Sequence, residues 1–269
     1  MAGIVFGCIT PHPPFIVPGI GNDEDKRPAS RTIAAMQELT DEFALSHPDT
    51  VIIVSPHSYY TEQLKMTVAL TGSSDGNLHE WGTSVPGQRF ENDRELAELV
   101  LEKARDKSVA VKPLEEKNYR LDHGILVPLY FLSNAMKGLP LLPLSFSYLP
   151  LKTHFAFGQA IQAAAKEAGR RVAFIASGDL SHYLKGSHYG YHSEGEIFEK
   201  NLAEALLRFD AKAVLKLDQD LIERAGECGL RSIVILLGAL DGLKAKVNIL
   251  SHEGPYGIGY MVASFQVKT

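Results

Sequence analysis

Short apolar runs alternate with amphipathic segments along most of the chain. The runs 4–9, 51–54 and 172–176 are continuously apolar, which is typical of strands buried on both faces of a parallel sheet. Over residues 30–45, apolar residues recur at helical spacing, and this predicts an amphipathic helix. The alternation continues to the C-terminus. It predicts a single α/β domain over residues 1–269, with a central, mostly parallel sheet flanked by helices.

The same patterns predict the remaining elements. Strands are expected near 66–70, 109–111, 139–146, 247–250 and 259–267, and helices near 91–105, 119–134, 152–168, 194–209, 211–217 and 230–240. Residues 71–90 are rich in Gly, Ser, Asn and Asp and contain the only tryptophan, Trp81. This composition predicts a long surface excursion, and loops of that length are often functional.

Histidines follow three of the apolar runs directly. His12 lies in Pro11-His-Pro13 after the first run, His57 follows Ser55-Pro56, and His182 ends Ser177-Gly-Asp-Leu-Ser-His182. The loops at the carboxyl ends of parallel strands build the ligand crevice of α/β proteins, and neutral imidazole binds Fe, Zn, Cu or Ni. We therefore expect His12 and His57 to share a metal site.

A third ligand is needed, and a carboxylate would suit oxygen chemistry. Two histidines and one carboxylate on one face of a ferrous ion leave the opposite face open to substrate and O2. Glu227, after a glycine at a predicted helix start, and Glu253 are the candidates. Their spacing alone does not separate them. Glu227 would otherwise stabilise the helix N-terminus.

Two further histidines are suited to acid–base chemistry. They are His182 and His123: an unperturbed histidine titrates near neutral pH and can take a proton from a bound phenol. Asp122 and Asp179 lie close to them in sequence. Each acid either orients an imidazole or caps a helix or turn, and the two roles are compatible.

Composition excludes several classes of protein. Hydrophobic residues make up 45% and charged residues 22% of the chain, as in ordinary globular proteins, and the net charge of −5 argues against nucleic acid or an anionic membrane surface as a partner. Two distant cysteines, Cys8 and Cys228, make a poor disulfide framework. With no signal-peptide pattern and no apolar run of transmembrane length, a cytoplasmic protein is expected. A homodimer is a reasonable expectation for the assembly.

Five short motifs in this order resemble those of the class III extradiol dioxygenases, the LigB-like superfamily that also contains the Memo proteins. They are Pro11-His-Pro13, Ser55-Pro-His57, Asp122-His-Gly124 with Val127-Pro-Leu129, Ser177-Gly-Asp-Leu-Ser-His182, and Gly226-Glu-Cys-Gly229. The segment Gly254–Tyr260 is similar to the branch associated with AMMECR-type domains and radical-SAM proteins. The resemblance therefore also implies a functional link to those proteins.

The resemblance implies a role for each candidate residue. His12, His57 and Glu227 would hold Fe(II), His182 would be the acid–base histidine, and His123 would be its partner on the substrate side. The implied activity is cleavage of a small aromatic substrate, a catechol or 2-aminophenol type of ring, with O2.

One departure from the dioxygenase pattern leaves a second interpretation open. Memo-type relatives have a cysteine in place of the carboxylate, and here Glu227 and Cys228 are adjacent. A shift of one residue makes Cys228 the ligand, and a thiolate favours softer metals. The alternatives are a Memo-like metal-binding interaction or redox protein, or a Zn2+-dependent enzyme on the same scaffold.

Overall fold

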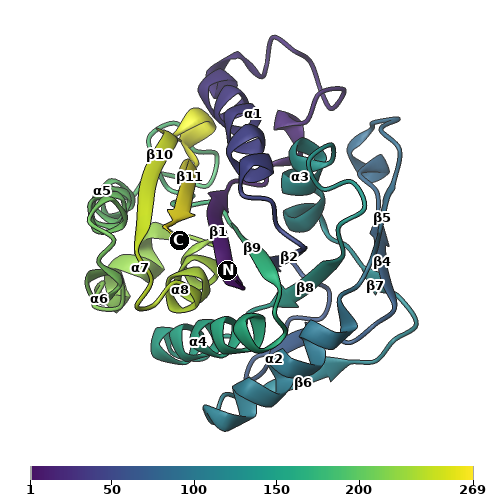
Figure 1. Ribbon diagram of the computed structural model, residues 1–269. Helices are drawn as coiled ribbons and strands as arrows, with labels where there is room; N and C mark the ends of the chain where they lie inside the picture. Colours follow the sequence, from purple (N-terminus) through teal and green to yellow (C-terminus); the bar gives the residue numbers. More distant parts are fainter. Residues whose placement is uncertain (1, 269) are drawn as a thin grey trace.

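The computed structural model describes residues 2–268. Its centre is an eight-stranded sheet in the order β10-β11-β1-β9-β2-β8-β3-β6, with helices on both faces (Figure 1). The strands are β1 (Gly3–Thr10), β2 (Thr50–Ser55), β3 (Met66–Ala69), β6 (Val111–Leu114), β8 (Leu141–Ser145), β9 (Arg171–Ser177), β10 (Ala245–Glu253) and β11 (Tyr260–Val267). The neighbouring pairs β1–β9, β9–β2 and β2–β8 are parallel. The α/β class and the mostly parallel sheet are confirmed.

Two layers of helices bury the two faces of the sheet. On one face lie α1 (Ser30–Leu45) and α3 (His123–Leu132); α2 (Arg94–Asp106), α4 (Leu151–Glu167) and α8 (Leu230–Ala239) cover the other. Beside α8, at the β10 edge of the sheet, lie α5 (Ser193–Leu207), α6 (Ala211–Val214) and α7 (Gln219–Ala225). Every residue of β2 is buried, which explains why this strand is continuously apolar rather than alternating.

The parallel pairing brings three loop starts to one edge of the sheet. β1, β9 and β2 are neighbours, with Thr10 opposite Ser177 and Val54 opposite Ala176. The loops that leave these strands therefore begin side by side. They carry the three histidines that follow the apolar runs.

Two segments differ from the sequence prediction. Residues 71–90 are not only a surface loop, because β4 (Ser73–Gly76) and β5 (Gln88–Glu91) form a three-stranded sheet with β7 (Tyr119–Arg120). A short helix, α7, precedes Gly226, although the sequence pattern did not predict it. Trp81 ends a single helical turn, η3 (His79–Trp81), between β4 and β5.

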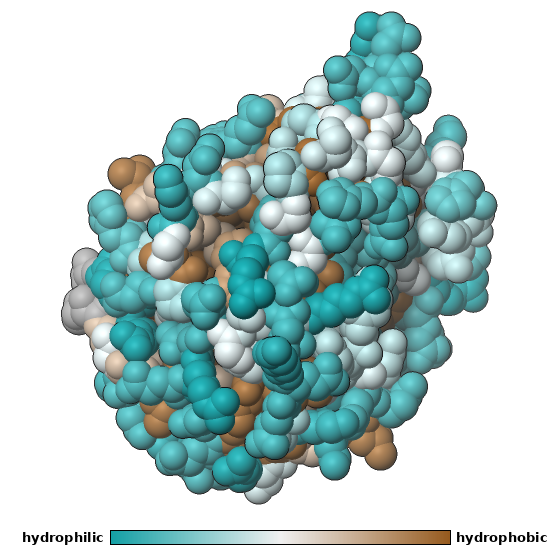
Figure 2. Space-filling view, turned by 90° about the vertical axis from the view of Figure 1, so that its right-hand side faces the viewer, coloured by the Kyte–Doolittle hydropathy of each residue, from teal (hydrophilic) through white to brown (hydrophobic). Residues whose placement is uncertain are grey.

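The surface on the side of β4 and β5 is mostly hydrophilic. Figure 2 shows hydrophobic residues there only in small, separate groups. Among residues 2–268, the helices are all too short or too polar to cross a membrane.

Candidate metal centre

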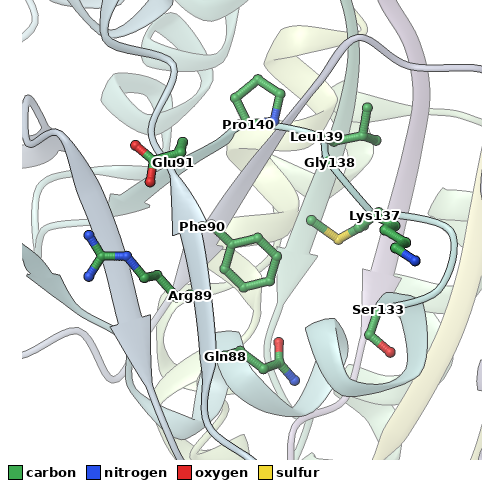
Figure 3. Close-up of a pocket in the computed structure, with 10 residues that line it drawn as sticks. Gln88, Arg89, Phe90, Glu91, Ser133, Lys137, Gly138, Leu139 and Pro140 are labelled. Atoms are coloured by element: carbon green, nitrogen blue, oxygen red, sulfur yellow. The ribbon is translucent and has the colours of Figure 1, made fainter.

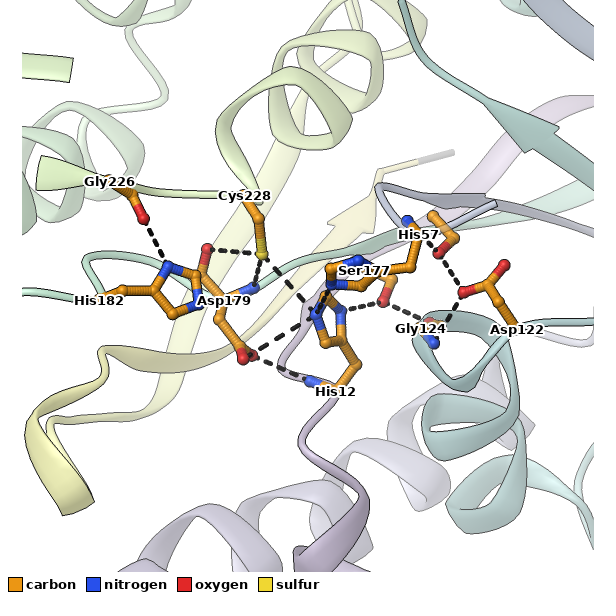
Figure 4. Close-up of polar contacts among 10 residues, drawn as sticks. His12, His57, Asp122, Gly124, Ser177, Asp179, His182, Gly226 and Cys228 are labelled. Carbon is orange, nitrogen blue, oxygen red and sulfur yellow. Dashed lines mark hydrogen bonds and ion pairs between the residues drawn. The ribbon is translucent and has the colours of Figure 1, made fainter. Parts of the chain in front are cut away.

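Three side chains from separate parts of the chain meet at the carboxyl edge of the sheet. One ligand atom from each of His12, His57 and Cys228 lies within 4.8 Å of the others. The two Nε2 atoms of His12 and His57 are 3.1 Å apart, and the Cys228 Sγ lies 3.7 Å from the His12 Nε2 (Figure 4). A metal bonded at about 2.0–2.1 Å to nitrogen and about 2.3 Å to sulfur separates its donors by roughly 3–3.6 Å. Two of the three donor separations are therefore close to those around a single metal ion, and the three donor atoms all lie within 4.8 Å of one another.

Close backbone contact brings the cysteine to the histidines. The carbonyl of Asp179, in the loop after β9, accepts hydrogen bonds from the backbone N–H groups of Cys228 and Gly229. A Cβ atom on Gly178 would lie only 2.1 Å from the Gly229 Cα. Because both positions are glycine, the start of α8 can approach the end of β9 closely enough to place Cys228 beside His12.

The hydrogen bonds of His12 determine which ring nitrogen can bind a metal. Its Nδ1 lies 3.0 Å from the Ser177 Oγ, and that hydroxyl donates its proton to the Gly124 carbonyl. The Ser177 oxygen must therefore accept a hydrogen bond from Nδ1–H of His12. The Nε2 atom is left with a free lone pair that faces His57 and Cys228. This is the arrangement that orients metal-binding histidines in proteins.

A second set of hydrogen bonds connects His57 to α3. The backbone N–H of His57 donates to the Ser55 Oγ, and the Ser55 hydroxyl donates to the Asp122 Oδ1 at 2.5 Å. The same carboxylate oxygen caps α3 by accepting from the N–H of Gly124 at 2.8 Å. Asp122 is therefore the helix cap that the sequence predicts. It also links the His57 loop to the helix that begins at His123.

The environment of the Cys228 sulfur suits a metal-bound thiolate. The backbone N–H of Asp179 donates to Sγ at 3.2 Å, and such a bond stabilises negative charge on sulfur. Burial, followed by the nearby carboxylates of Asp179 and Glu227, raises the pKa of the Cys228 thiol. A coordinated cation reverses that effect and deprotonates the thiol.

The carboxylate of Glu227 lies elsewhere. It accepts a hydrogen bond from the N–H of Leu230 at 2.5 Å and lies 3.6 Å from an Arg231 guanidinium nitrogen. It thus caps the start of α8, the alternative role that the sequence left open. Glu253 binds Arg31 and Thr32. Neither glutamate lies in the cluster; the side chain that lies beside His12 is Cys228, the neighbour of Glu227.

His123 and His182 border the cluster on two sides. The His123 ring stacks on His57 at 4.5 Å between centroids and meets the His12 ring edge-on at 5.5 Å. The His182 Nδ1 donates to the Gly226 carbonyl, so its Nε2 carries the lone pair. Figure 4 shows the His182 ring beside Asp179.

Burial keeps the four imidazoles neutral. It lowers the pKa of His12, His123 and His182 below the ordinary value. Burial, followed by the charges of His123 and His182, lowers the pKa of His57 to about 4. Neutral imidazoles retain the lone pairs that metal binding and proton acceptance require.

Sequence reasoning did not assign a role to two side chains of this region. Ser177 orients His12, and the Trp81 ring lies 5.7 Å from the His123 ring. Ser177 belongs to the same short motif as His182, and Trp81 is the only tryptophan in the long polar segment. These two features of the sequence could have indicated that Ser177 and Trp81 lie near the site.

Two cavities differ in their relation to the cluster. A polar cavity of about 350 Å³ is lined by Arg120, Tyr59, Asp75 and His123. It is linked to the cluster through His123, whose ring stacks on that of His57. A larger groove of about 620 Å³ lies between β5 and residues 133–140 (Figure 3). Its lining includes none of the clustered histidines. The smaller cavity is therefore the better candidate for a substrate site.

Comparison with known proteins identifies relatives that include MEMO1 family proteins and a dioxygenase subunit. Protein CA_C1420 of Clostridium acetobutylicum is 34% identical over 96% of this chain, which spans 56% of that protein's length. A MEMO1 family protein of Methanococcoides burtonii is 26% identical, with 96% of this chain and 82% of the relative covered. The 2-aminophenol 1,6-dioxygenase alpha subunit of a Pseudomonas species is 25% identical, with coverage of 87% and 89%.

Structure and family comparisons agree with these relatives. The crystal structure of the uncharacterized protein JW3007 from Escherichia coli K12 has a TM-score of 0.62 and 18% sequence identity. It matches 97% of this chain and 99% of the other, which shows a shared fold. The family model described as the catalytic LigB subunit of aromatic ring-opening dioxygenase matches residues 7–263. The chain therefore belongs to the LigB family, as its motifs and its strand-end histidines predict.

Proposed function

We propose that this protein is a metal-dependent dioxygenase that opens the ring of a catechol or 2-aminophenol type of substrate with O2. The observation that carries the proposal is the cluster of His12, His57 and Cys228 beside two neutral histidines. Membership of the LigB family and the similarity to a 2-aminophenol dioxygenase subunit support it.

His12, His57 and Cys228 would hold Fe(II), in a site that contains a thiolate where we expected the Glu227 carboxylate. The metal would supply a binding position for O2 and lower the pKa of a coordinated ring hydroxyl. The chain's own residues would orient the ring and move its protons. Ser177 orients His12, and the hydrogen bond from Asp179 stabilises the sulfur.

His182 is the proposed proton acceptor. Its Nδ1 is committed to the Gly226 carbonyl, so the Nε2 lone pair is free. Burial lowers the pKa of His182 and leaves it unprotonated at neutral pH. It can therefore accept a proton from a ring hydroxyl and return it later. His123 lines the adjacent cavity, where it would contact the ring.

An electron paramagnetic resonance experiment tests this function. The protein is loaded with Fe(II) without oxygen, exposed to nitric oxide as a substitute for O2, and then treated with a panel of catechols and 2-aminophenol. We expect a ferrous-nitrosyl signal whose shape changes when the aromatic ligand binds. Absence of a nitrosyl signal in iron-loaded protein would refute the dioxygenase proposal.

Matched variants test the ligand set. Cys228→Ser removes the proposed thiolate, and we expect Fe(II) affinity to fall by about tenfold or more, comparable to losses at other metal sites. Glu227→Gln should leave the affinity within about twofold, because this carboxylate caps α8 instead. The opposite ranking, measured by chelator competition, would restore Glu227 as the ligand.

The thiol also favours a second candidate function. A cysteine in the cluster, together with similarity to MEMO1 family proteins, is compatible with a metal-binding protein that does not cleave rings, or with a zinc enzyme. Metal analysis of protein purified without added iron distinguishes these functions. Bound zinc or copper, together with no nitrosyl signal, would favour the second candidate.

A further inference from the structure

Tyr260 begins β11 between the loops that carry two of the site histidines. The neighbouring Gly259 donates a backbone hydrogen bond to the Ser181 carbonyl and accepts one from Leu180, both at 2.8 Å. β11 also pairs antiparallel with β1, with Ile9 opposite Ala263. The start of β11, where Tyr260 lies, is therefore held beside the loop that carries His182, and β1, which leads to His12, is its neighbour in the sheet.

The Tyr260 side chain is fully buried, yet its hydroxyl is unpaired. Its exposed fraction is 0%, and within residues 2–268 the hydroxyl oxygen has no hydrogen-bond partner. Buried tyrosine hydroxyls usually have one, because an unpaired polar group in the interior is costly. The ring is held in place beside Phe15, with the centroids 6.4 Å apart. An oriented but unpaired donor of this kind is expected where a ligand provides the acceptor.

The surroundings of Tyr260 keep its proton in place. Burial raises the pKa of the phenol, and the nearby Asp179, Tyr256, Cys228 and Tyr189 raise it further. In the protein without a bound metal, the hydroxyl therefore keeps its proton and can donate a hydrogen bond. Asp179 and Cys228 both belong to the surroundings of His12, so the donor lies near the metal ligands.

We propose that Tyr260 contacts the substrate and donates a hydrogen bond from its hydroxyl to the anionic oxygen of the aromatic ring bound at this site. The inference rests on the proposed function and deepens it, because it assigns a donor to one ring oxygen. A hydrogen bond to an ionised oxygen is stronger than one between neutral groups. The bond therefore favours the ionised ring over the neutral one.

Tyr260→Phe tests the proposal, with Tyr119→Phe as the matched control. Tyr119 is also buried, but its hydroxyl is hydrogen-bonded to the Ser58 Oγ at 2.6 Å. In metal-free protein, Tyr260→Phe removes an unpaired group, and we expect Tm to stay the same or rise by about 2–4 °C. Tyr119→Phe breaks a satisfied bond, and its Tm should fall.

The binding experiment uses 4-nitrocatechol, whose absorbance reports its ionisation, with Fe(II)-loaded protein in the absence of oxygen. We expect Tyr260→Phe to raise the Kd by about tenfold or more and to leave Fe(II) affinity unchanged. Tyr119→Phe should keep the wild-type Kd. If wild-type protein binds 4-nitrocatechol and Tyr260→Phe binds it equally well, this inference alone is overturned. A fall in Tm for Tyr260→Phe as large as that of the control would also overturn it. If the iron-loaded wild-type protein does not bind the probe, the proposed function fails and the inference fails with it.

Discussion

Ser177→Ala should weaken metal binding without touching a proposed metal ligand. The Ser177 hydroxyl accepts the Nδ1–H of His12 and donates to the Gly124 carbonyl. Removing it leaves two buried groups unpaired, at about 1–3 kcal/mol each. The free energy of unfolding should therefore fall by about 2–6 kcal/mol. A domain near the middle of the ordinary stability range of about 5–15 kcal/mol remains folded after such a loss.

The effect on the metal follows from the tautomer of His12. Without the serine oxygen, nothing fixes the His12 proton on Nδ1, and the ring is free to rotate away from His57. Loss of such an orienting partner lowers metal affinity by about 10–100-fold. We expect this loss in chelator competition at 25 °C, with circular dichroism to verify the fold.

Ser264→Ala provides the control, because Ser264 is also buried in a strand and its hydroxyl has no partner within the described residues 2–268. It should change neither stability nor affinity by a comparable amount. If Ser177→Ala lowers stability as expected but keeps the metal affinity within twofold of wild type, the argument that Ser177 sets the ligating nitrogen of His12 is wrong.

Two further predictions concern the backbone and the pH dependence of stability. Gly178→Ala places a Cβ 2.1 Å from the Gly229 Cα, so we expect the free energy of unfolding in urea to fall by about 3 kcal/mol or more and metal binding to weaken. Gly72→Ala is the control, because no atom lies within 4 Å of the added Cβ, and it should change neither. Burial raises the pKa of Asp122 from 3.8 to about 6, which means that the folded state favours the protonated acid. The stability that this proton provides is complete below about pH 4 and is lost as pH rises through 6, by about 3 kcal/mol at most. Asp122→Asn should flatten that pH dependence, and an unchanged slope between pH 4 and 7 would contradict the assignment.

Most of the fold could be predicted because burial leaves a direct pattern in the sequence. The centres of β2 and β9, residues 51–54 and 172–176, are continuously apolar because both of their faces are covered. β4 could not be predicted in this way. Its sequence, Ser-Ser-Asp-Gly, has no apolar residue, and it is a strand only because β5 and β7 pair with it. Residues 73–76 therefore form a strand because they pair with β5 and β7, and not because of their own residue types.

The sequence could predict that His12 and His57 lie close together, but not which residue from the segment 226–229 lies beside them. The strand ends placed His12 and His57 together because parallel neighbours end at one edge. They could not decide between Glu227 and Cys228, since this choice depends on how the chain turns between two helices. Gly226 has a left-handed φ of 59°, and the turn that it begins directs the glutamate back to α8 and the cysteine to His12. The pattern of residue types does not show which of the two side chains points toward His12 after this turn.

A thiolate at Cys228 preserves the charge of the site that a carboxylate would have produced. Two neutral imidazoles and one anionic ligand leave a divalent ion with a net charge of +1, whichever residue supplies the anion. That charge would match the monoanion of a catechol or an aminophenol, so a thiolate in place of a carboxylate would not by itself change the class of substrate that we propose. It alters which metal is preferred, because sulfur favours softer ions than oxygen does. The hydrogen bond from Asp179 to Sγ offsets part of this change by withdrawing electron density from the sulfur. In the proposed site a thiolate from Cys228 would therefore be compatible with Fe(II), and loss of the Asp179 contact would favour zinc or copper instead.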